Sequence, residues 1–422
     1  MIMTIQRRAL LATPLALPAL AQTSPVEISF QYSIPELFRG LMEEMTAAFM
    51  RANPNVRVSI RAPEPDYEAL LQRNLRDAVT RQLPDVAFHG LNRQRTLVER
   101  EIPVDLKPFM AADARIAEQG YSESLLSLGQ VGAAQTGIGF ALSTPILYYN
   151  VELLRRAGGN PENLPTSWEQ VAALARAIHG TAENLNGMFF DWTITGNWAW
   201  QALVFSHGGT MLSADERQVA MANEHGQRAM AALRLMIDEG RMPDLRSTAA
   251  ISDFFAGRLG ISMQSTAQLG RYNREIGGRF PLVCGRFPIP GPNARLPAGG
   301  NVAMMFARDA AKQAAAWDFI KFATGPVGAT MMVNATGYMP ASTIPAQREE
   351  MLGRFYRENP NHMVTFRQQD VITGWYAFPG QNALRITDTI NDHLQSVVGK
   401  RAEPAAVLTR MAADVQALLP RR

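Results

Sequence analysis

The residue types that carry most catalytic and metal chemistry are few and widely spaced in this chain. There is one cysteine, Cys284, in the apolar context Leu-Val-Cys-Gly, so an intramolecular disulfide and a multi-cysteine metal site are both excluded. The six histidines are scattered, and no two of them stand at a metal-ligand spacing. The sequence holds no G-x-S-x-G, no H-E-x-x-H, no P-loop and no G-x-G-x-x-G after a strand. This pattern favours a protein that binds a ligand over one that transforms it.

The composition and length are those of a globular protein of two or three domains, or of one large α/β unit. The 422 residues are 47% hydrophobic and 19% charged, which excludes a disordered chain. The net charge is only +3, and basic residues form no block of the kind that grips a phosphate backbone. Nucleic-acid binding is therefore not expected.

The first 21 residues have the pattern of a secretory signal peptide. Arg7 and Arg8 precede a short apolar run that contains two prolines, and Ala19-Leu20-Ala21 is a cleavage site of the A-x-A kind. The run is too short to span a bilayer. There is no cysteine near the cleavage site, so a lipid anchor is excluded. We expect cleavage before Gln22 and a mature protein in the periplasm, exported by the general or the twin-arginine route.

The beginning of the mature chain predicts a parallel α/β sheet. Residues 26–32, 56–60 and 84–88 are short segments rich in β-branched and apolar residues, and each is typical of a strand. Between them, residues 35–52 and 67–82 carry apolar side chains at helical spacing. This β-α-β-α-β order indicates parallel strands joined by right-handed crossovers.

Two polar steps interrupt apolar segments further along the chain. Ser143-Thr144-Pro145 joins two strand-like halves, and residues 336–340 read Thr-Gly-Tyr-Met-Pro. Residues 165–169 (Pro-Thr-Ser-Trp-Glu) open a helix for which we expect Thr166 to be the N-cap. Clefts between α/β domains are favoured places for ligand sites.

These segments resemble the extracellular solute-binding proteins of ABC importers (extracellular solute-binding protein family 1). The resemblance is carried by Ser-Thr-Pro-Ile-Leu-Tyr-Tyr-Asn at 143–150, by the Trp-Glu helix start at 165–169 and by Thr-Gly-Tyr-Met-Pro at 336–340. It extends in order over nearly all of the mature chain, through Phe355-Tyr-Arg-Glu-Asn-Pro360 and 379–385. Within the family it is strongest to the periplasmic members that bind sn-glycerol 3-phosphate.

The resemblance implies a fold and a set of partners. The fold class is α/β, with the type II arrangement of two hinge-linked lobes and the ligand in the cleft between them. The domain boundaries follow it: a signal peptide at 1–21, an N-terminal lobe of 22–143 and 300–338, and a C-terminal lobe of 144–299 and 339–422. The partners implied are a small solute and the permease subunits of an importer with a cytoplasmic ATPase. No metal, cofactor or enzymatic activity is implied, and a monomer is expected.

The resemblance also assigns ligand contacts. It places them at Tyr67, Ser143, Gly300, Tyr338 and Arg385, and at Ser265 or Thr266, with Trp192 and Trp198 as an aromatic wall. The residue types suit a phosphate ester, because an arginine fork can pair two phosphate oxygens and hydroxyls can complete the shell. A glycine lets the backbone N–H approach the ligand closely, and a tryptophan face can cover a carbon chain or an ammonium group.

One position departs from the family pattern. The glycerol-phosphate binders carry a carboxylate after the third strand, and His89 stands at the matching position here. The expected solute is therefore sn-glycerol 3-phosphate or a glycerophosphodiester such as glycerophosphocholine. Two alternatives stay open at this point: a sugar or oligosaccharide binder of the same class, and a secreted hydrolase, for which no converging nucleophile and base can be found.

Overall fold

The computed structural model describes residues 24–291, 293–400 and 402–420. The predicted signal peptide at 1–21 lies outside these ranges. Within them, no helix combines the length and the apolar character that crossing a membrane requires.

The first of two main sheets has five strands in the order β2-β1-β3-β12-β6. Strand β1 pairs in parallel with β2 and with β3, which confirms the predicted β-α-β-α-β order, and β12 runs antiparallel to β3 and β6. The strands are β1 (Val26–Gln31), β2 (Val56–Ile60), β3 (Val86–Gly90), β6 (Ile138–Ser143) and β12 (Gly299–Met305).

Helices pack on this sheet through apolar stripes. In α1 (Pro35–Ala52), Phe38, Leu41, Met45 and Phe49 are buried at the spacing of successive helical turns. The other long helices are α2 (Tyr67–Val79), α12 (Ala310–Thr324) and α13 (Pro326–Ala335). The short elements are η1 (Leu91–Arg93), α3 (Gln94–Val98), α4 (Lys107–Ala112), η2 (Ile116–Gln119), α5 (Glu123–Leu126), η3 (Ser127–Gly129), β4 (Gln130–Val131), β5 (Ala134–Gln135), α14 (Ile344–Gln347), η6 (Glu349–Gly353) and α15 (Arg354–Glu358).

The second sheet has four strands in the order β10-β7-β9-β8. Strand β7 is antiparallel to β9 and β10, and β8 is parallel to β9. The strands are β7 (Pro145–Asn150), β8 (Asn186–Phe190), β9 (Leu259–Ser265) and β10 (Leu282–Arg286).

The helices that accompany the second sheet come from the middle and the end of the chain. They are α6 (Val151–Arg156), α7 (Trp168–His179), η4 (Thr195–Asn197), α8 (Trp198–Ser206), α9 (Glu224–Asp238), α10 (Ser247–Phe255), η5 (Thr266–Gln268), α11 (Leu269–Ile276), η7 (Pro360–Val364), η8 (Phe366–Val371), α16 (Ala383–Val398) and α17 (Pro404–Leu418). A short parallel pair, β11 (Leu296–Pro297) with β13 (Ile372–Thr373), lies beside them.

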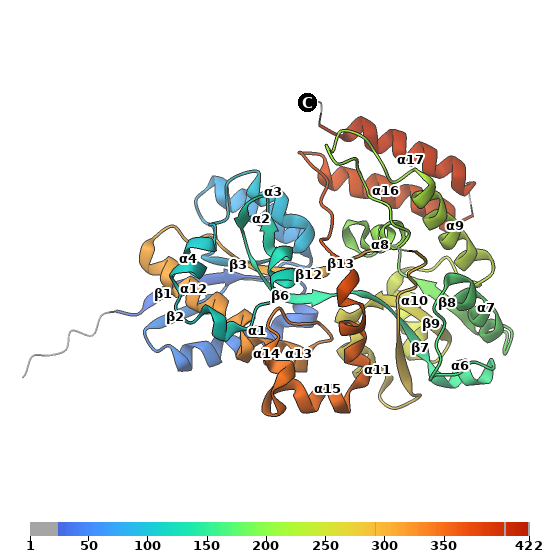
Figure 1. Ribbon diagram of the computed structural model, residues 1–422, viewed down its shortest axis with the longest axis horizontal. Helices are drawn as coiled ribbons and strands as arrows, with labels where there is room; N and C mark the ends of the chain where they lie inside the picture. Colours follow the sequence, from blue (N-terminus) through green and yellow to red (C-terminus); the bar gives the residue numbers. More distant parts are fainter. Residues whose placement is uncertain (1–23, 292, 401, 421–422) are drawn as a thin grey trace, which may run out of the picture.

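The molecule has two lobes because each sheet has its own hydrophobic core. One buried cluster gathers side chains around β1, β3 and α12, and another gathers them around β7, β9 and α8. Figure 1 shows β1, β2 and β3 with their helices on one side and β7, β8 and β9 with theirs on the other. The expected two-lobe α/β fold is thus confirmed. A third buried cluster, with Tyr67, Trp198 and Trp375, holds side chains of both lobes and forms the seam between them.

The chain passes between the lobes where β6 leads into β7, at Ser143-Thr144-Pro145. It returns where β11 leads into β12, because Leu296 belongs to the second core and Gly299 begins β12. Leu352 and Tyr356 still pack in the first core, whereas Val364 packs in the second. The segment 344–358 therefore accompanies the first lobe, although the predicted boundary at 338 assigns it to the second. The exact lobe boundaries stay a prediction.

The start of α7 differs by one residue from the prediction. The N-cap is Ser167, whose Oγ accepts a hydrogen bond from the Gln170 N–H, and not Thr166. Gln170 Oε1 in turn accepts from the Thr166 N–H at 2.9 Å. Gln170, and not the expected Glu169, reaches back to the start of the helix, and it bonds the residue before the N-cap and not the N-cap N–H of a capping box.

A glycine in β12 is required by close backbone contact. Gly300 has φ of +101°, and a Cβ at this residue would lie 1.8 Å from the Ala141 carbonyl oxygen.

We predict that Gly300→Ala lowers the free energy of unfolding by at least about 2 kcal/mol in urea denaturation. Gly40→Ala is the matched control, because its Cβ meets nothing within 4 Å in α1 and should raise stability by about 0.5–1 kcal/mol. Similar values for both variants would contradict this account of β12.

Candidate functional site

Strand register places two serines at the same crossing between the lobes. Ser143, the last residue of β6, is opposite Gly299 in β12, and Ser265, the last residue of β9, is opposite Pro145 in β7. Because β6 runs directly into β7, the ends of the two sheets meet at this point. Polar side chains from both lobes are thereby brought to the seam.

A cavity of about 260 Å³ lies at this crossing, and we call it the inner cavity. The first lobe contributes one set of its walls: Ile34, Glu36, Leu37, Pro65, Asp66, Tyr67, Ser143, Gly299, Gly300 and Tyr338. The remaining walls come from the second-lobe elements and their connections: Ile194, Thr195, Trp198, Gln264, Ser265, Ala267, Gln268 and Trp375. The volume lies below the range usual for sites of drug-sized ligands, so this cavity suits a small solute.

Two buried tyrosines provide hydroxyl groups in the inner cavity. Tyr67 and Tyr338 are 3% and 5% exposed, and Asn301 Nδ2 donates to the Tyr67 hydroxyl at 3.3 Å. Burial raises the pKa of Tyr67 to about 12 and that of Tyr338 well above its ordinary value. Both phenols are therefore neutral at physiological pH and can donate or accept hydrogen bonds.

Aromatic rings from both lobes cover another side of the cavity. The Trp375 ring lies 6.4 Å from the Tyr67 ring and 6.1 Å from the Trp198 ring, centroid to centroid. Trp198 Nε1 donates to the Pro297 carbonyl at 3.0 Å, and Trp375 Nε1 donates to the Gly196 carbonyl at 3.4 Å. These bonds fix the orientation of the rings, so the aromatic wall is already formed.

Several helices begin at the inner cavity. They are α1 after Ile34, α2 after Asp66, α8 after Asn197, and η5 with α11 after Ser265. Neither α1 nor α8 has a side-chain cap, and Ile34 itself has a left-handed backbone (φ 60°), an uncommon conformation for a β-branched residue. Most of the backbone N–H groups here already have acceptors: the Thr266 N–H donates to the Thr144 carbonyl, and the Ala267 N–H donates to Ser265 Oγ. The helix dipoles still favour an anion at such a place.

The side-chain charges at the cavity are negative. Among its described lining residues there are two carboxylates, Glu36 and Asp66, and no lysine or arginine. A buried guanidinium, that of Arg93, is linked to the cavity wall through Glu68. Arg93 is 3% exposed and forms an ion pair with Glu68. Glu68 also accepts a hydrogen bond from Thr195 Oγ1 at 2.5 Å, and Thr195 lines the cavity. A cation thus lies behind the wall and is already neutralised.

Unpartnered polar atoms accumulate at the seam. Asn92 is 2% exposed, and neither its Oδ1 nor its Nδ2 has a hydrogen-bond partner among the described residues. The same holds for Asn301 Oδ1, Arg93 Nε and Gln268 Oε1. Buried polar groups are nearly always paired in folded proteins, so this concentration indicates a place that receives a polar ligand.

A larger cavity of about 770 Å³ lies further along the seam, and we call it the outer cavity. Trp375 is a wall of both cavities. The outer cavity takes walls from Leu91 to Gly132 of the first lobe, and from 205–216, Arg295 and 372–377 beside the second. Arg95 of α3 forms a bidentate pair with Glu216 at this cavity, joining the two lobes.

Six of the residues expected to contact ligand line the inner cavity together. They are Tyr67, Ser143, Trp198, Ser265, Gly300 and Tyr338. The other four, His89, Trp192, Thr266 and Arg385, are not among its walls. Their contact roles stay untested predictions, and the structure gives a physical reason for the position of each.

His89 is buried within the first lobe. Its Nε2 lies 2.9 Å from Asn74 Oδ1, its ring lies 5.8 Å from that of Phe306, and the side chain is inaccessible to solvent. Burial lowers its pKa to about 3, so the imidazole is neutral. The position after β3 that reaches the seam is Asn92, three residues later, because η1 turns the chain there.

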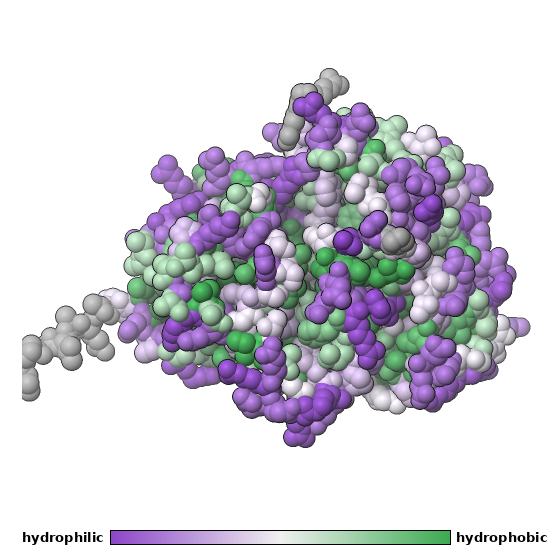
Figure 2. Space-filling view, viewed as in Figure 1, coloured by the Kyte–Doolittle hydropathy of each residue, from purple (hydrophilic) through white to green (hydrophobic). Residues whose placement is uncertain are grey.

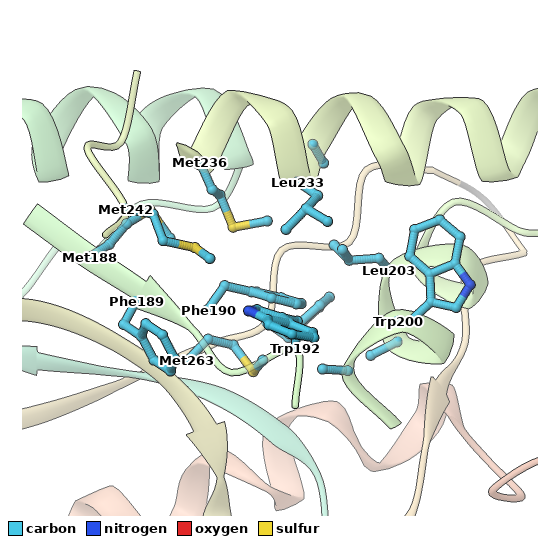
Figure 3. Close-up of a cluster of buried hydrophobic side chains, with 14 of the residues drawn as sticks. Met188, Phe189, Phe190, Trp192, Trp200, Leu203, Leu233, Met236, Met242 and Met263 are labelled. Carbon is cyan, nitrogen blue, oxygen red and sulfur yellow. The ribbon is translucent and has the colours of Figure 1, made fainter. Parts of the chain in front are cut away.

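Trp192 and Thr266 are held by packing in the second lobe. Figure 3 shows Trp192 among hydrophobic side chains that include Phe190 and Met263, and the residue is 5% exposed. Thr266 is buried, and its Oγ1 accepts a hydrogen bond from the Thr144 N–H at 3.2 Å. Of the alternative Ser265 or Thr266, the structure brings Ser265 to the cavity.

Arg385 lies in the first turn of α16 and is exposed. The buried stripe of this helix runs through Ala383, Ile386, Thr387 and Ile390, and Arg385 is not part of it. The helix therefore buries its apolar face against the second lobe and leaves this guanidinium on the outside. Figure 2 shows that hydrophilic side chains cover much of the visible surface.

Sequence reasoning missed several walls of the site. Trp375 and Thr195 line the inner cavity from a loop and a single turn, where no hydrophobic periodicity marks the orientation of a side chain. Glu36 and Asp66 carry a usable signal, because acidic residues at helix starts can be recognised from sequence.

The interpretation of Cys284 as an inert buried thiol is supported, since burial raises its pKa. The described ranges contain no group of three or more metal-ligating side chains.

Comparisons with known proteins agree on a family. The family model of bacterial extracellular solute-binding proteins matches residues 44–356. The sn-glycerol-3-phosphate-binding periplasmic protein UgpB of Pectobacterium atrosepticum is 24% identical over 245 residues, covering 54% of this chain and 53% of that protein. UgpB of Salmonella typhimurium is 22% identical over 368 residues, covering 83% and 81%. The chain spans only about half to 63% of the length of the first curated relatives it matches.

Solved structures share the fold at low sequence identity. UgpB from Mycobacterium tuberculosis in complex with glycerophosphocholine has a TM-score of 0.81 and 18% identity, covering 94% of this chain and 98% of that one. The cyclic alpha-maltosyl-1,6-maltose binding protein from Arthrobacter globiformis has a TM-score of 0.78 and 20% identity, covering 94% and 99%. The two TM-scores are nearly equal, so the fold alone does not select a solute.

The buried state of His89 predicts a pH dependence of stability. An unfolded histidine has a pKa near 6.5, and the folded value is about 3, so the unfolded chain binds an extra proton between these values. The free energy of unfolding should fall by up to about 1.4 kcal/mol per pH unit from this residue as the pH drops below about 6.5. Urea denaturation of His89→Gln at a series of pH values should show a correspondingly shallower dependence of the free energy of unfolding on pH. A His89→Gln slope equal to that of the unaltered protein would contradict the burial of a neutral imidazole.

Proposed function

The chain belongs to the family of bacterial extracellular solute-binding proteins, and from this premise we propose that it delivers a glycerol-phosphate-type solute to an ABC importer. The solute is sn-glycerol 3-phosphate or a glycerophosphodiester such as glycerophosphocholine. The observation that carries the proposal is the meeting of Tyr67, Ser143, Ser265, Gly300 and Tyr338 at one small cavity between the lobes. Two of these positions, Ser143 and Tyr338, lie in segments on which the resemblance to the glycerol-phosphate binders rests.

The phosphate is bound in this proposal without a direct cation. The N-termini of α1 and of η5 with α11 lie at the inner cavity, and each helix start carries a partial positive charge that favours the phosphate. Hydroxyls of Ser143, Ser265 and Tyr67 supply further hydrogen-bond donors. Gly300 exposes its backbone because it has no side chain.

The glycerol carbons and any second substituent contact the aromatic wall. Trp198 and Trp375 offer ring faces and edges held by hydrogen bonds at their indole nitrogens, and Tyr67 offers a ring whose hydroxyl accepts a hydrogen bond from Asn301. An ammonium group over such a face gains about 0.5–2 kcal/mol from the cation–π attraction. Glu36 and Asp66 stand at the cavity and favour a positive substituent, which supports a phosphodiester of choline or ethanolamine over a phosphomonoester.

The protein acts by recognition alone. Its lobes close over the solute in the periplasm, and the closed complex docks on the membrane permease, whose cytoplasmic ATPase drives uptake. Metal chemistry and covalent chemistry have no part in this proposal.

A second candidate is an uncharged sugar or polyol. It is favoured by the two carboxylates and the absence of lysine and arginine among the described walls of the inner cavity, because carboxylates accept hydrogen bonds from hydroxyls. The fold similarity to a maltosyl-maltose binding protein is compatible with it. The small volume of the inner cavity argues against an oligosaccharide there.

A thermal-shift screen separates these candidates. A solute that binds only the folded protein raises the melting temperature by mass action. We expect glycerophosphocholine and glycerol 3-phosphate to raise it, and inorganic phosphate, choline, glycerol and maltose to have no effect at the same concentration. A shift with maltose and none with either phosphate ester would overturn the proposal in favour of a sugar binder.

Titration calorimetry of variants tests the assigned contacts. Tyr67→Phe removes a buried hydroxyl and should weaken glycerophosphocholine binding about threefold to tenfold, the value of one hydrogen bond. Arg385→Ala is the matched control: its guanidinium is exposed and outside the cavity walls, so affinity should stay within about twofold. A large loss from Arg385→Ala with none from Tyr67→Phe would move the phosphate site to α16.

A further inference from the structure

One ion pair crosses the seam at the outer cavity. Arg95 Nη1 and Nη2 donate to the two carboxylate oxygens of Glu216 at 2.5 and 2.7 Å, and the Tyr376 hydroxyl donates to Glu216 Oε1 at 3.0 Å. Arg95 belongs to α3 of the first lobe, whereas Glu216 and Tyr376 lie beside the second core. Among the ion pairs formed by the described residues, it is the one that connects the two lobes. Its two parallel N–H···O bonds have the strongest geometry that an arginine–carboxylate pair can adopt.

The backbone at Glu216 is held in an uncommon conformation. Its φ is +58°, in the left-handed region, where a non-glycine residue carries a steric cost. The turn is fixed by a hydrogen bond from the Glu216 N–H to the Ser213 carbonyl at 2.9 Å and by the isolated bridge between Leu212 and Val219. These bonds therefore hold Glu216 in its strained backbone conformation. From this turn, its carboxylate reaches Arg95 of the opposite lobe.

On the second lobe, hydrogen bonds to a buried glutamine hold the backbone of Tyr376 in place. Gln201, which is fully buried, accepts from the Tyr376 N–H at 3.0 Å and donates to the Tyr376 carbonyl at 3.1 Å. On the first lobe, Arg95 Nε also donates to Glu99 at 2.8 Å along the same helix. Arg95 thus keeps a partner when the lobes separate, which reduces the cost of opening.

We propose that Arg95, Glu216 and Tyr376 form a clasp that holds the lobes closed and so raises the affinity for every solute without contacting any. The apparent dissociation constant equals the intrinsic one divided by the fraction of molecules in the binding-competent state, so a clasp that changes this fraction changes all affinities by the same factor. The proposal rests on the solute-binding function proposed above only in requiring that the lobes open and close.

The clasp is tested first without any solute. Spin labels at Val79→Cys in the first lobe, an 85% exposed position, and at the exposed Arg410→Cys in the second lobe report the distance between lobes by pulsed electron paramagnetic resonance. Glu216→Gln keeps the shape of the side chain and removes its charge. It should shift the distance distribution toward longer values, as should raising sodium chloride from about 50 mM to about 500 mM, because salt screens a partly exposed pair. An unchanged distribution would overturn the clasp.

The second readout is titration calorimetry with two probes, glycerol 3-phosphate and glycerophosphocholine. Glu216→Gln should weaken both by the same factor, about threefold to tenfold, and Arg95→Gln with Glu216→Gln should not weaken them further. Glu99→Gln is the control, since it removes a carboxylate from the same arginine within one lobe and should leave both affinities unchanged. Factors that differ between the probes by more than about threefold would show that Glu216 contacts solute and would overturn the proposal.

The two proposals fail in distinguishable ways. If neither probe binds the unaltered protein, the glycerol-phosphate function is wrong, and the distance measurement still decides on the clasp. If both probes bind and the Glu216→Gln distances and affinities match those of the unaltered protein, the function stands and the clasp is wrong.

Discussion

The structure depends on one constraint: two sheets with separate cores share a seam that, in the proposed function, has to be buried around a solute and to open for its exchange. A seam built as a normal core would lock the lobes together, and a seam built as a normal surface would hold no solute. The third buried cluster meets both demands by mixing aromatic rings with polar groups. Asn92, Asn301 and Arg93 each leave at least one buried polar atom without a partner among the described residues. Such atoms are costly in a permanent core and useful in a cleft that closes on a polar ligand.

The fold was largely predictable because its elements carry periodic patterns. The range predicted for α1 agrees with the structure, and the three parallel strands follow from short apolar runs separated by helices. The crossing at Ser143-Thr144-Pro145 was visible as a polar step inside an apolar segment. Once the crossing is fixed, strand register places Ser143 and Ser265 at the seam.

The site was only partly predictable because it is made of loops and single turns. His89 and Asn92 are three residues apart, yet η1 turns one into the core and the other to the seam, and no sequence period encodes that turn. Arg385 was assigned by resemblance alone, and the burial stripe of α16 leaves it outside. Trp375 lies near Tyr67 and Trp198 only through tertiary packing across long sequence separations. The lobe boundary after 338 fails to anticipate the packing of Leu352 for the same reason.

The electrostatics of the seam give the account its chemical content. An arginine fork was expected at the phosphate, and the inner cavity instead offers helix N-termini, hydroxyls and two carboxylates. The partial positive charge at a helix start can favour an anion. Unlike an arginine, it does not form a permanent ion pair with a neighbouring carboxylate. The one buried guanidinium close by, Arg93, is occupied by Glu68. This arrangement suits a solute whose anionic group is balanced by a cationic one, as in a zwitterionic phosphodiester.

A crystal structure of the protein with glycerophosphocholine tests the central claim most directly. The account predicts that the phosphate lies in the inner cavity beside the start of α1, within hydrogen-bond distance of the Ser143 or the Ser265 hydroxyl. Glycerophosphocholine found elsewhere, or a phosphate paired with Arg385 on α16, would contradict it.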